Sequence, residues 1–142
     1  MNIFVRPAQR EDSEKFTEWS SPLIPNFDPE VVSYPGSITL CAFNEKGVLA
    51  FLPIQSPIIS STQMLETLVM KPGASDLEIA GALREFIKSA ITIGYMKDAG
   101  EIYFVGDHEA TNKVAARIFE PVPYPVYRLR LKDLECKEST QS

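Results

Sequence analysis

The sequence predicts a mixed α/β protein of one domain, in which an antiparallel meander of strands joins a parallel β-α-β unit around one central mixed sheet. Two observations lead to this prediction: a hairpin pattern over residues 37–54, and a long amphipathic helix pattern between two strand-like segments. The length of 142 residues suits one domain, and no linker rich in Gly or Ser divides it. We expect this domain to cover residues 1–131, followed by a flexible polar tail over 132–142.

Composition excludes several classes of function. Fourteen basic against nineteen acidic residues give a net charge of −5, which repels nucleic acid. No apolar run approaches the roughly 20 residues of a membrane span, and the N-terminus does not resemble a signal peptide. Cys41 and Cys136 do not form a disulfide framework, and a single histidine argues against a zinc site. We therefore expect a cytoplasmic protein that binds no nucleic acid, membrane or metal.

The first half of the chain predicts a strand, a short helix and a hairpin. The strand covers residues 2–6, and Asp12 is placed to cap a helix that includes Phe16 and Trp19. Prolines then break the chain into an irregular connection. The hairpin has arms at 37–43 and 48–54, both rich in β-branched and aromatic residues, and Gly47 supplies the positive φ that its turn needs.

The second half predicts the β-α-β unit. A third strand covers residues 63–71, and a helix over 76–93 has apolar residues at 77, 79, 80, 83, 86, 87, 90 and 91, with Gly94 in the C′ position. A buried strand at 101–105, a helix at 110–117 and a closing strand at 126–131 complete the order. The unit through the long helix requires a parallel crossover, with helices on both faces of the sheet.

Local sequence adds a resemblance to a known family. Met70, Lys71 and Pro72 end the third strand, residues 75–80 form the loop that starts the long helix, and the segment 107–110, the pair Ile118-Phe119 and the closing "YRLRL" follow. This order resembles the GNAT family, the CoA-dependent N-acyltransferases, over about residues 2–131. The resemblance implies a GNAT-like fold, acetyl-CoA as cofactor if the protein is active, and an amine as acyl acceptor.

The resemblance also implies the positions of a cofactor site. In active members, backbone N–H groups at the start of the long helix hold the CoA pyrophosphate, and glycines allow its close approach. The matching positions here are Met70, Lys71, Ser75, Asp76, Leu77, Glu78, Ile79, Ala80 and Asp107. Asp76 and Glu78 stand where the family has glycines, and two carboxylates repel a pyrophosphate. Ser75 and Glu78 instead form an S-x-x-E capping box that satisfies the helix end by itself.

Catalytic candidates are few. Glu66 is the ionisable residue in the middle of the third strand, where the family often places a base, and burial would raise its pKa; a solvent-facing glutamate is the alternative. The tyrosine that the family uses as general acid falls on Val114. Tyr124 and Tyr127 lie later in the chain and could substitute, or simply pack in a strand. His108 precedes a helix, as many surface histidines do.

These residues predict a GNAT-fold protein with a degraded pyrophosphate loop, acting as a binding, structural or accessory module with weak or no acetyltransferase activity. The alternative is a working N-acetyltransferase that transfers an acetyl group from acetyl-CoA to an amine. The short chain and the acidic "SDLEIA" loop are also similar to small GNAT-like proteins of tailed phages, which would place the protein in a host cytoplasm or a virion. A protein partner or a homodimer through the closing strand fits either alternative.

Overall fold

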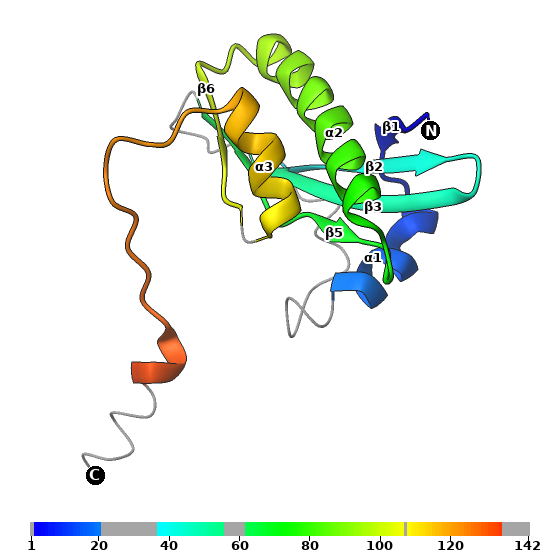
Figure 1. Ribbon diagram of the computed structural model, residues 1–142, viewed down its shortest axis with the longest axis horizontal. Helices are drawn as coiled ribbons and strands as arrows, with labels where there is room; N and C mark the ends of the chain where they lie inside the picture. The colour runs from blue at the N-terminus through cyan, green and yellow to red at the C-terminus, as the bar shows by residue number, and fades with distance from the viewer. Residues whose placement is uncertain (1, 21–36, 56–61, 107, 135–142) are drawn as a thin grey trace.

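The computed structural model describes residues 2–20, 37–55, 62–106 and 108–134 (Figure 1). In chain order the elements are β1 Phe4–Pro7, a 3-10 turn Arg10–Asp12, α1 Ser13–Ser20, β2 Ser37–Asn44, β3 Gly47–Gln55, β4 Thr62–Leu65, β5 Val69–Met70, α2 Asp76–Met96, β6 Glu101–Phe104 and α3 Glu109–Ile118. Among these residues, no helix is both long enough and apolar enough to cross a membrane.

All six strands belong to one mixed sheet with the order β1-β2-β3-β4-β6, and β5 pairs with β3 beside β4. The pairs from β1 to β4 are antiparallel, whereas β4 and β6 are parallel, with Leu65 opposite Phe104. The predicted meander and the parallel β-α-β unit through α2 are therefore confirmed.

The hairpin of β2 and β3 is also confirmed, because its signals are local. Asn44 pairs with Gly47 across the turn, and the Asn44 side-chain oxygen accepts a hydrogen bond from the N–H of Lys46 at 2.9 Å. Gly47 has φ of 123°, a conformation that L residues other than glycine rarely adopt.

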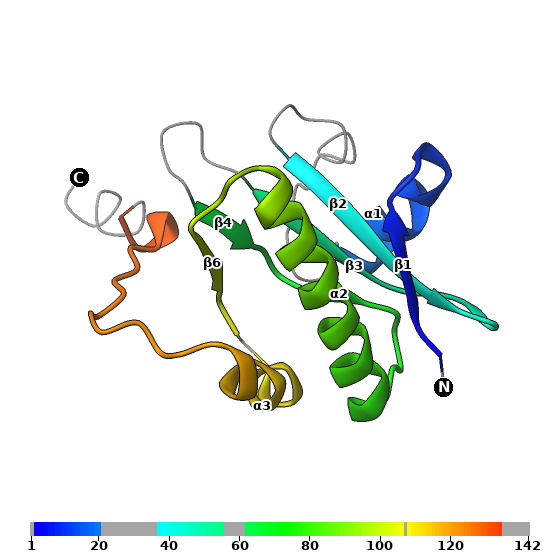
Figure 2. The same cartoon turned by 90° about the horizontal axis from the view of Figure 1, so that it is seen from above.

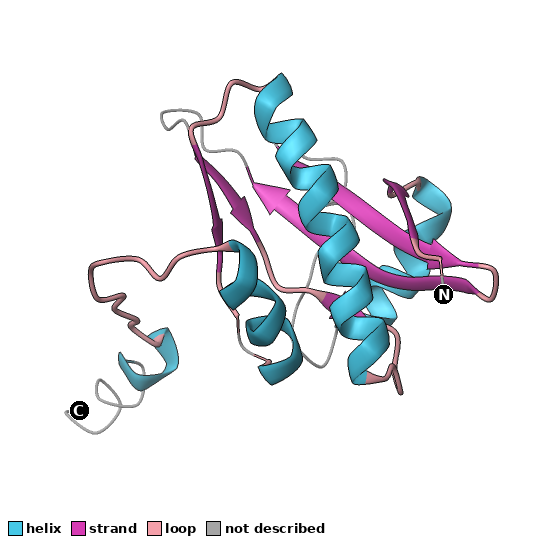
Figure 3. Cartoon of the chain, turned by 45° about the horizontal axis from the view of Figure 1, so that its top comes forward, coloured by secondary structure: helices cyan, strands magenta, loops and turns pink. Residues whose placement is uncertain are grey.

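Helices cover both faces of the sheet. The helix α2 crosses one face with α3 beside it, and α1 lies on the opposite face (Figure 2, Figure 3). Because side chains alternate along a strand, Leu40 and Ala42 of β2 join the core under α2, while Cys41 joins a smaller core with Phe16 and Phe51 under α1. The predicted two-sided architecture follows from this division.

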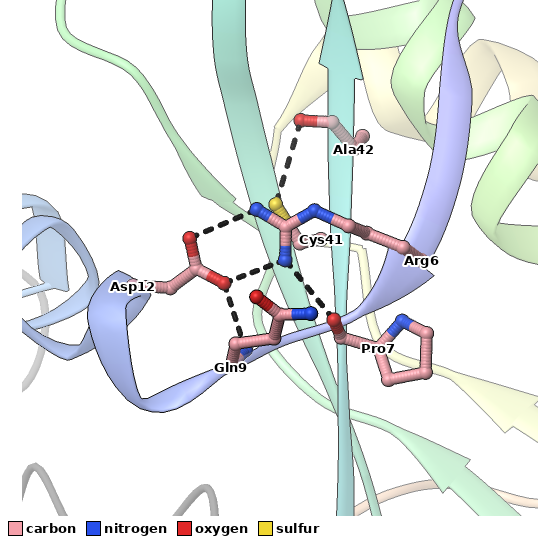
Figure 4. A network of polar contacts seen from close by, with 6 residues as sticks. All are labelled: Arg6, Pro7, Gln9, Asp12, Cys41 and Ala42. Atoms are coloured by element: carbon pink, nitrogen blue, oxygen red, sulfur yellow. Dashed lines mark hydrogen bonds and ion pairs between the residues drawn. The ribbon is translucent and has the colours of Figure 1, made fainter.

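A partly buried ion pair between Arg6 and Asp12 lies at the entry to α1 (Figure 4). Asp12 was expected to cap the helix, but a 3-10 turn begins at Arg10 and contains it. Its carboxylate accepts a hydrogen bond from the N–H of Gln9 at 2.8 Å and binds the guanidinium of Arg6 from β1. Asp12 does not cap α1 because Arg6 of β1 holds its carboxylate.

Two expectations about the β-α-β unit need correction. The predicted strand 63–71 is interrupted at residues 66–68, so that β4 and β5 are separate, and Glu66 lies in the interruption. Gly94 does not end the long helix. It is buried within the last turn, and the chain leaves the helix after Met96 through Asp98, which has φ of 57°. An αL residue does end this helix, but it is an aspartate, a residue that tolerates that conformation.

The expected closing strand at 126–131 is absent. Residues 126–130 are exposed and belong to no strand or helix, and a single helical turn covers 131–134. The preceding strand, β6, is only partly buried, against the expectation of a buried strand over 101–105. An alternating pattern predicts the conformation of a strand, but a strand forms only where a partner edge accepts its hydrogen bonds.

Candidate functional site

A cleft lies beside β5, next to the first turns of α2 and α3. The pairing of β6 with β4 ends at Phe104, and β5 pairs only with β3 among the described strands, so its other edge carries no strand. The cavity beside this edge has a volume of about 510 Å³. Its lining residues are Trp19, Thr67, Leu68, Met70, Lys71, Pro72, Gly73, Ala74, Ile79, His108 and Thr111.

The sequence "KPGA" turns the chain from β5 into α2 beside this cleft. The N–H of Lys71 donates to the carbonyl of Leu49 on β3 at 2.8 Å, and the N–H of Ala74 donates back to the carbonyl of Lys71 at 3.2 Å. Gly73 has φ of 81°, and Pro72 precedes it. Proline followed by a glycine of positive φ is the signature of a type II turn, which fixes the direction in which α2 starts.

The start of α2 is capped by its own side chains. Ser75 Oγ accepts a hydrogen bond from the N–H of Glu78 at 3.2 Å, and Glu78 Oε1 accepts one from the N–H of Ser75 at 3.1 Å. This confirms the predicted capping box. The backbone hydrogen bond from Ser75, with that of its side chain, lowers the pKa of the Glu78 carboxyl. The anion thus present at this helix end is the protein's own carboxylate.

A second hollow lies between α2 and α3 and carries three cationic side chains. Its volume is about 350 Å³. Arg84 of α2 and Lys113 and Arg117 of α3 line it, together with the acidic Asp76 and Glu109. Lys113 pairs loosely with Glu109 at 3.7 Å, while neither Arg84 nor Arg117 forms a salt bridge with another described residue. We call Arg84, Lys113 and Arg117 the cationic group.

Sequence reasoning missed the cationic group, although a signal for it exists. Lys113 and Arg117 are four residues apart, a spacing that places both on one face of α3. Nothing in the sequence alone indicates that this face meets the face of α2 that carries Arg84.

His108 lies where the two hollows meet, since it lines both. It is the N-cap of α3, and its Nδ1 accepts a hydrogen bond from the N–H of Ala110 at 3.1 Å. With Nδ1 in use as an acceptor, the neutral ring carries its proton on Nε2, which can donate to a ligand but cannot take a proton from one.

The predicted cofactor positions surround the start of α2. Met70, Lys71 and Ile79 line the cleft. Asp76, Leu77 and Ala80 line the hollow between the helices. Ser75 and Glu78 form the capping box, and Asp107 is outside the described residues.

The predicted catalytic residues are not brought together. Glu66 is exposed and lines neither hollow, which agrees with the solvent-facing alternative. Tyr124 is 54% exposed, and its hydroxyl donates to the hydroxyl of Tyr103 at 3.3 Å. Tyr103 in turn donates to Glu101, which raises the pKa of the Tyr103 phenol. Val114, in the position of the family's acid, is buried in the core.

Among the described residues, no group of three or more His, Cys, Asp or Glu side chains is placed to hold a metal ion.

Comparisons with known proteins give matches only in structure. No protein-family model matches the chain, and no curated protein matches it. Among solved structures, a ribosomal-protein-alanine N-acetyltransferase from Brucella melitensis matches with a TM-score of 0.68 and 10% identity, covering 92% of this chain and 99% of the other. The aminoglycoside acetyltransferase AAC(6')-Iy, crystallised with a CoA-linked bisubstrate analogue, matches with a TM-score of 0.67 and 17% identity, covering 92% and 99%.

A protein described as a transcriptional regulator from Bacillus halodurans matches with a TM-score of 0.70 and 11% identity, covering 91% of this chain and 99% of its own. At such identities the likeness establishes the fold and leaves the activity open. The order of the sheet and these structural matches, most of them to N-acetyltransferases, show that the chain has the GNAT acetyltransferase fold.

Proposed function

We propose that this protein binds an acyl-CoA, such as acetyl-CoA, and transfers the acyl group to an amine. The observation that carries this proposal is the unpaired edge of β5 beside a cleft of about 510 Å³. The pantetheine arm of CoA contains two amides, which can pair with a free strand edge as an added strand does. Structural neighbours with this fold include proteins crystallised with CoA or a CoA conjugate.

The acidic start of α2 argues against a pyrophosphate in the place that the family resemblance implies, because the capping box already occupies the amides of Ser75 and Glu78. The cationic group supplies the alternative. Arg84, Lys113 and Arg117 line the hollow next to the helix start, and His108, which lines both this hollow and the cleft, adds its Nε2 as a further donor. We therefore assign the nucleotide phosphates of CoA to the cationic group.

In the reaction, the amine nitrogen bonds to the acyl carbon, the carbon–sulfur bond breaks, and CoA leaves as a thiolate that takes up a proton. The amine must lose a proton, and we assign this step to Glu66 through water, because Glu66 directly precedes the cleft residue Thr67. Tyr124 is a weaker candidate for the proton donor, since its hydroxyl already donates to Tyr103.

A second candidate is a module that binds a partner without catalysis. The capping box and the buried Val114 favour it, because both replace groups on which active members of the resembled family depend. A phage origin stays a prediction from the loop sequence, as nothing in the fold bears on it.

Calorimetric titration of acetyl-CoA, followed by an assay for free CoA thiol with a panel of amines, tests the proposal. We expect micromolar affinity, about −8 kcal/mol, and at least a tenfold loss in the double variant Arg84→Glu with Arg117→Glu. Arg10→Glu, a charge reversal in the turn on the opposite face of the sheet, is the control and should bind normally. Absence of saturable binding up to millimolar concentration would disprove the proposal, and binding without transfer to any amine would favour the second candidate.

A further inference from the structure

The cleft beside β5 is lined from both faces of the sheet. Leu68 and Met70 also pack against the core under α2, and Thr111 belongs to α3 on that same face. Trp19 belongs to α1, which covers the opposite face and packs against β5 (Figure 3). The cleft therefore runs past the edge of β5, from the face that carries α2 to the face that carries α1.

The indole ring of Trp19 is held in place by aromatic packing. Its centroid lies 5.6 Å from that of Phe51, and the Phe51 ring lies 5.3 Å from Phe16 in an edge-to-face arrangement. Phe16, Phe51 and Val69 are buried in the smaller core under α1, and Trp19 packs against this core. Because a close-packed core resists displacement of its side chains, the indole forms a rigid wall of the cleft.

The hollow between α2 and α3 sets the direction in which an acyl-CoA would lie. All the residues given above for its lining belong to α2, to α3 or to the N-cap of α3, which places the hollow on one face of the sheet. His108 lines both the hollow and the cleft, so a ligand held by the cationic group enters the cleft past His108. The phosphates and the acyl group lie at opposite ends of an acyl-CoA. Phosphates at the cationic group therefore direct the acyl group toward the face of α1, where Trp19 lies.

We propose that Trp19 restricts the acyl group that this protein accepts to a short chain, such as acetyl or propionyl. The inference rests on the proposed function, because it uses the assignment of the CoA phosphates to the cationic group. Trp19 has the largest side chain of the cleft lining and is the one residue of α1 in it. A longer acyl chain meets the indole, and it can extend only by displacing a ring that Phe51 holds.

The affinities of two thioesters of different length test this restriction without a known amine. In calorimetric titrations of the full chain, the wild type should bind acetyl-CoA about tenfold or more tightly than hexanoyl-CoA. Trp19→Ala should remove or reverse this preference, because the longer chain then fills the space of the indole. Trp19→Phe keeps an aromatic ring against Phe51 and should give an intermediate ratio, so the test does not depend on the folding of the alanine variant.

Tyr95→Ala is the matched control, since it also removes an aromatic ring. Tyr95 is 82% exposed and lies in the last turn of α2, at the other end of the helix from the cleft. This variant should keep the wild-type ratio. Equal affinity of the wild type for both thioesters, or one ratio shared by the wild type and the folded Trp19 variants, would overturn the restriction and leave the proposed function standing. If the wild type binds neither thioester, the proposed function is disproved and the restriction with it.

The fluorescence of Trp19 tests the direction of the ligand. Trp19 is the only tryptophan of the chain, so its emission reports on this end of the cleft alone. Acetyl-CoA should shift the emission to shorter wavelength, because the acyl group displaces water from the ring. Adenosine 3′,5′-bisphosphate, the nucleotide part of CoA, should bind at the cationic group and leave the emission unchanged. An equal shift with the nucleotide alone would place the phosphates beside Trp19 and overturn the proposal.

Discussion

The guanidinium of Arg6 holds the carboxylate of Asp12 through two hydrogen bonds of 2.7 and 3.0 Å, joining the first strand to the turn that starts α1 (Figure 4). Asp12 is 6% exposed, and it also accepts a hydrogen bond from the N–H of Gln9. Both side chains are ionised, and two hydrogen bonds join the guanidinium to the carboxylate. This contact is therefore stronger than an exposed salt bridge. It sets the position of α1, whose Trp19 lines the cleft.

We expect Asp12→Asn to lower the free energy of unfolding at neutral pH by about 2 kcal/mol, because it removes the charge that faces Arg6. The side-chain hydrogen bond from Arg6 holds the pKa of Asp12 below its ordinary value of 3.8. The stabilisation is therefore complete above that ordinary value and is lost as the pH falls through the lowered pKa, because the unfolded chain binds the proton first.

Urea unfolding at several pH values between 7 and 3 measures this effect. The wild type should lose stability relative to Asp12→Asn as the solution becomes acidic, and the difference between the two curves should narrow toward the lowest pH. Lys88→Ala removes an ion pair whose lysine side chain is 72% exposed and should change stability by less than about 0.5 kcal/mol. Curves that stay parallel at every pH would show that the charge of Asp12 does not stabilise the fold.

The acidic start of α2 gives a second prediction. We expect Asp76→Gly with Glu78→Gly to bind acetyl-CoA more tightly than the wild type, because two like charges near the phosphates are removed and the amides of the capping box are released. The gain should be several-fold. Calorimetry measures the affinity.

The milder variant Glu78→Gln separates the two causes, since it keeps a side chain that can accept from Ser75 while removing the charge. A gain in Glu78→Gln similar to that of the double variant would assign the effect to charge alone. Unchanged affinity in both variants would mean that the CoA phosphates contact neither residue and lie at some distance from the helix start.

A buried amide without partners gives a third prediction. Gln63 of β4 is 1% exposed, and neither its Nε2 nor its Oε1 has a hydrogen-bond partner among the described residues. Burying an unsatisfied polar group costs about 1–3 kcal/mol. Gln63→Met, of similar volume, should therefore raise the free energy of unfolding by about 1 kcal/mol.

Thermal and urea unfolding measure this change. Gln63→Glu serves as the matched control, since it keeps the shape and adds a buried charge, and it should destabilise the protein clearly. A loss of stability in Gln63→Met would reveal a partner for the amide, such as a bound water.

The parts of this molecule that could be predicted from sequence are those that depend on neighbours in the chain. The turn before Gly47 and the capping box of Ser75 and Glu78 each form within four residues, so their signals are complete in the sequence. Gly94 was misread because a glycine near the end of a helix pattern usually ends it. Its actual place, buried against Gln63 and Ile102, depends on strands far along the chain.

The candidate site shows the same division. Most of the cofactor positions implied by the family resemblance gather around the start of α2, because one loop carries them. The cationic group was missed because it combines Arg84 with residues of another helix. The prediction of a closing strand at 126–131 was wrong for a related reason. Its alternating pattern is local, but the strand edge that would have to pair with it is not.

The buried thiol gives the last prediction. Cys41 is 0% exposed on β2, and burial raises the pKa of its thiol to about 11. Because the thiolate is the reactive form, its fraction at pH 8 is on the order of one in a thousand, and the reagent has no path to it in the folded protein. In a Cys136→Ser background, Cys41 should therefore react with a thiol reagent only when the protein unfolds, at a rate that rises with urea as the unfolded population does. Glu45→Cys in a chain lacking both natural cysteines places a thiol in the exposed hairpin turn and should react within the mixing time of a bench assay. Fast labelling of Cys41 without denaturant would show that the core between β2 and α1 opens far more often than its packing implies.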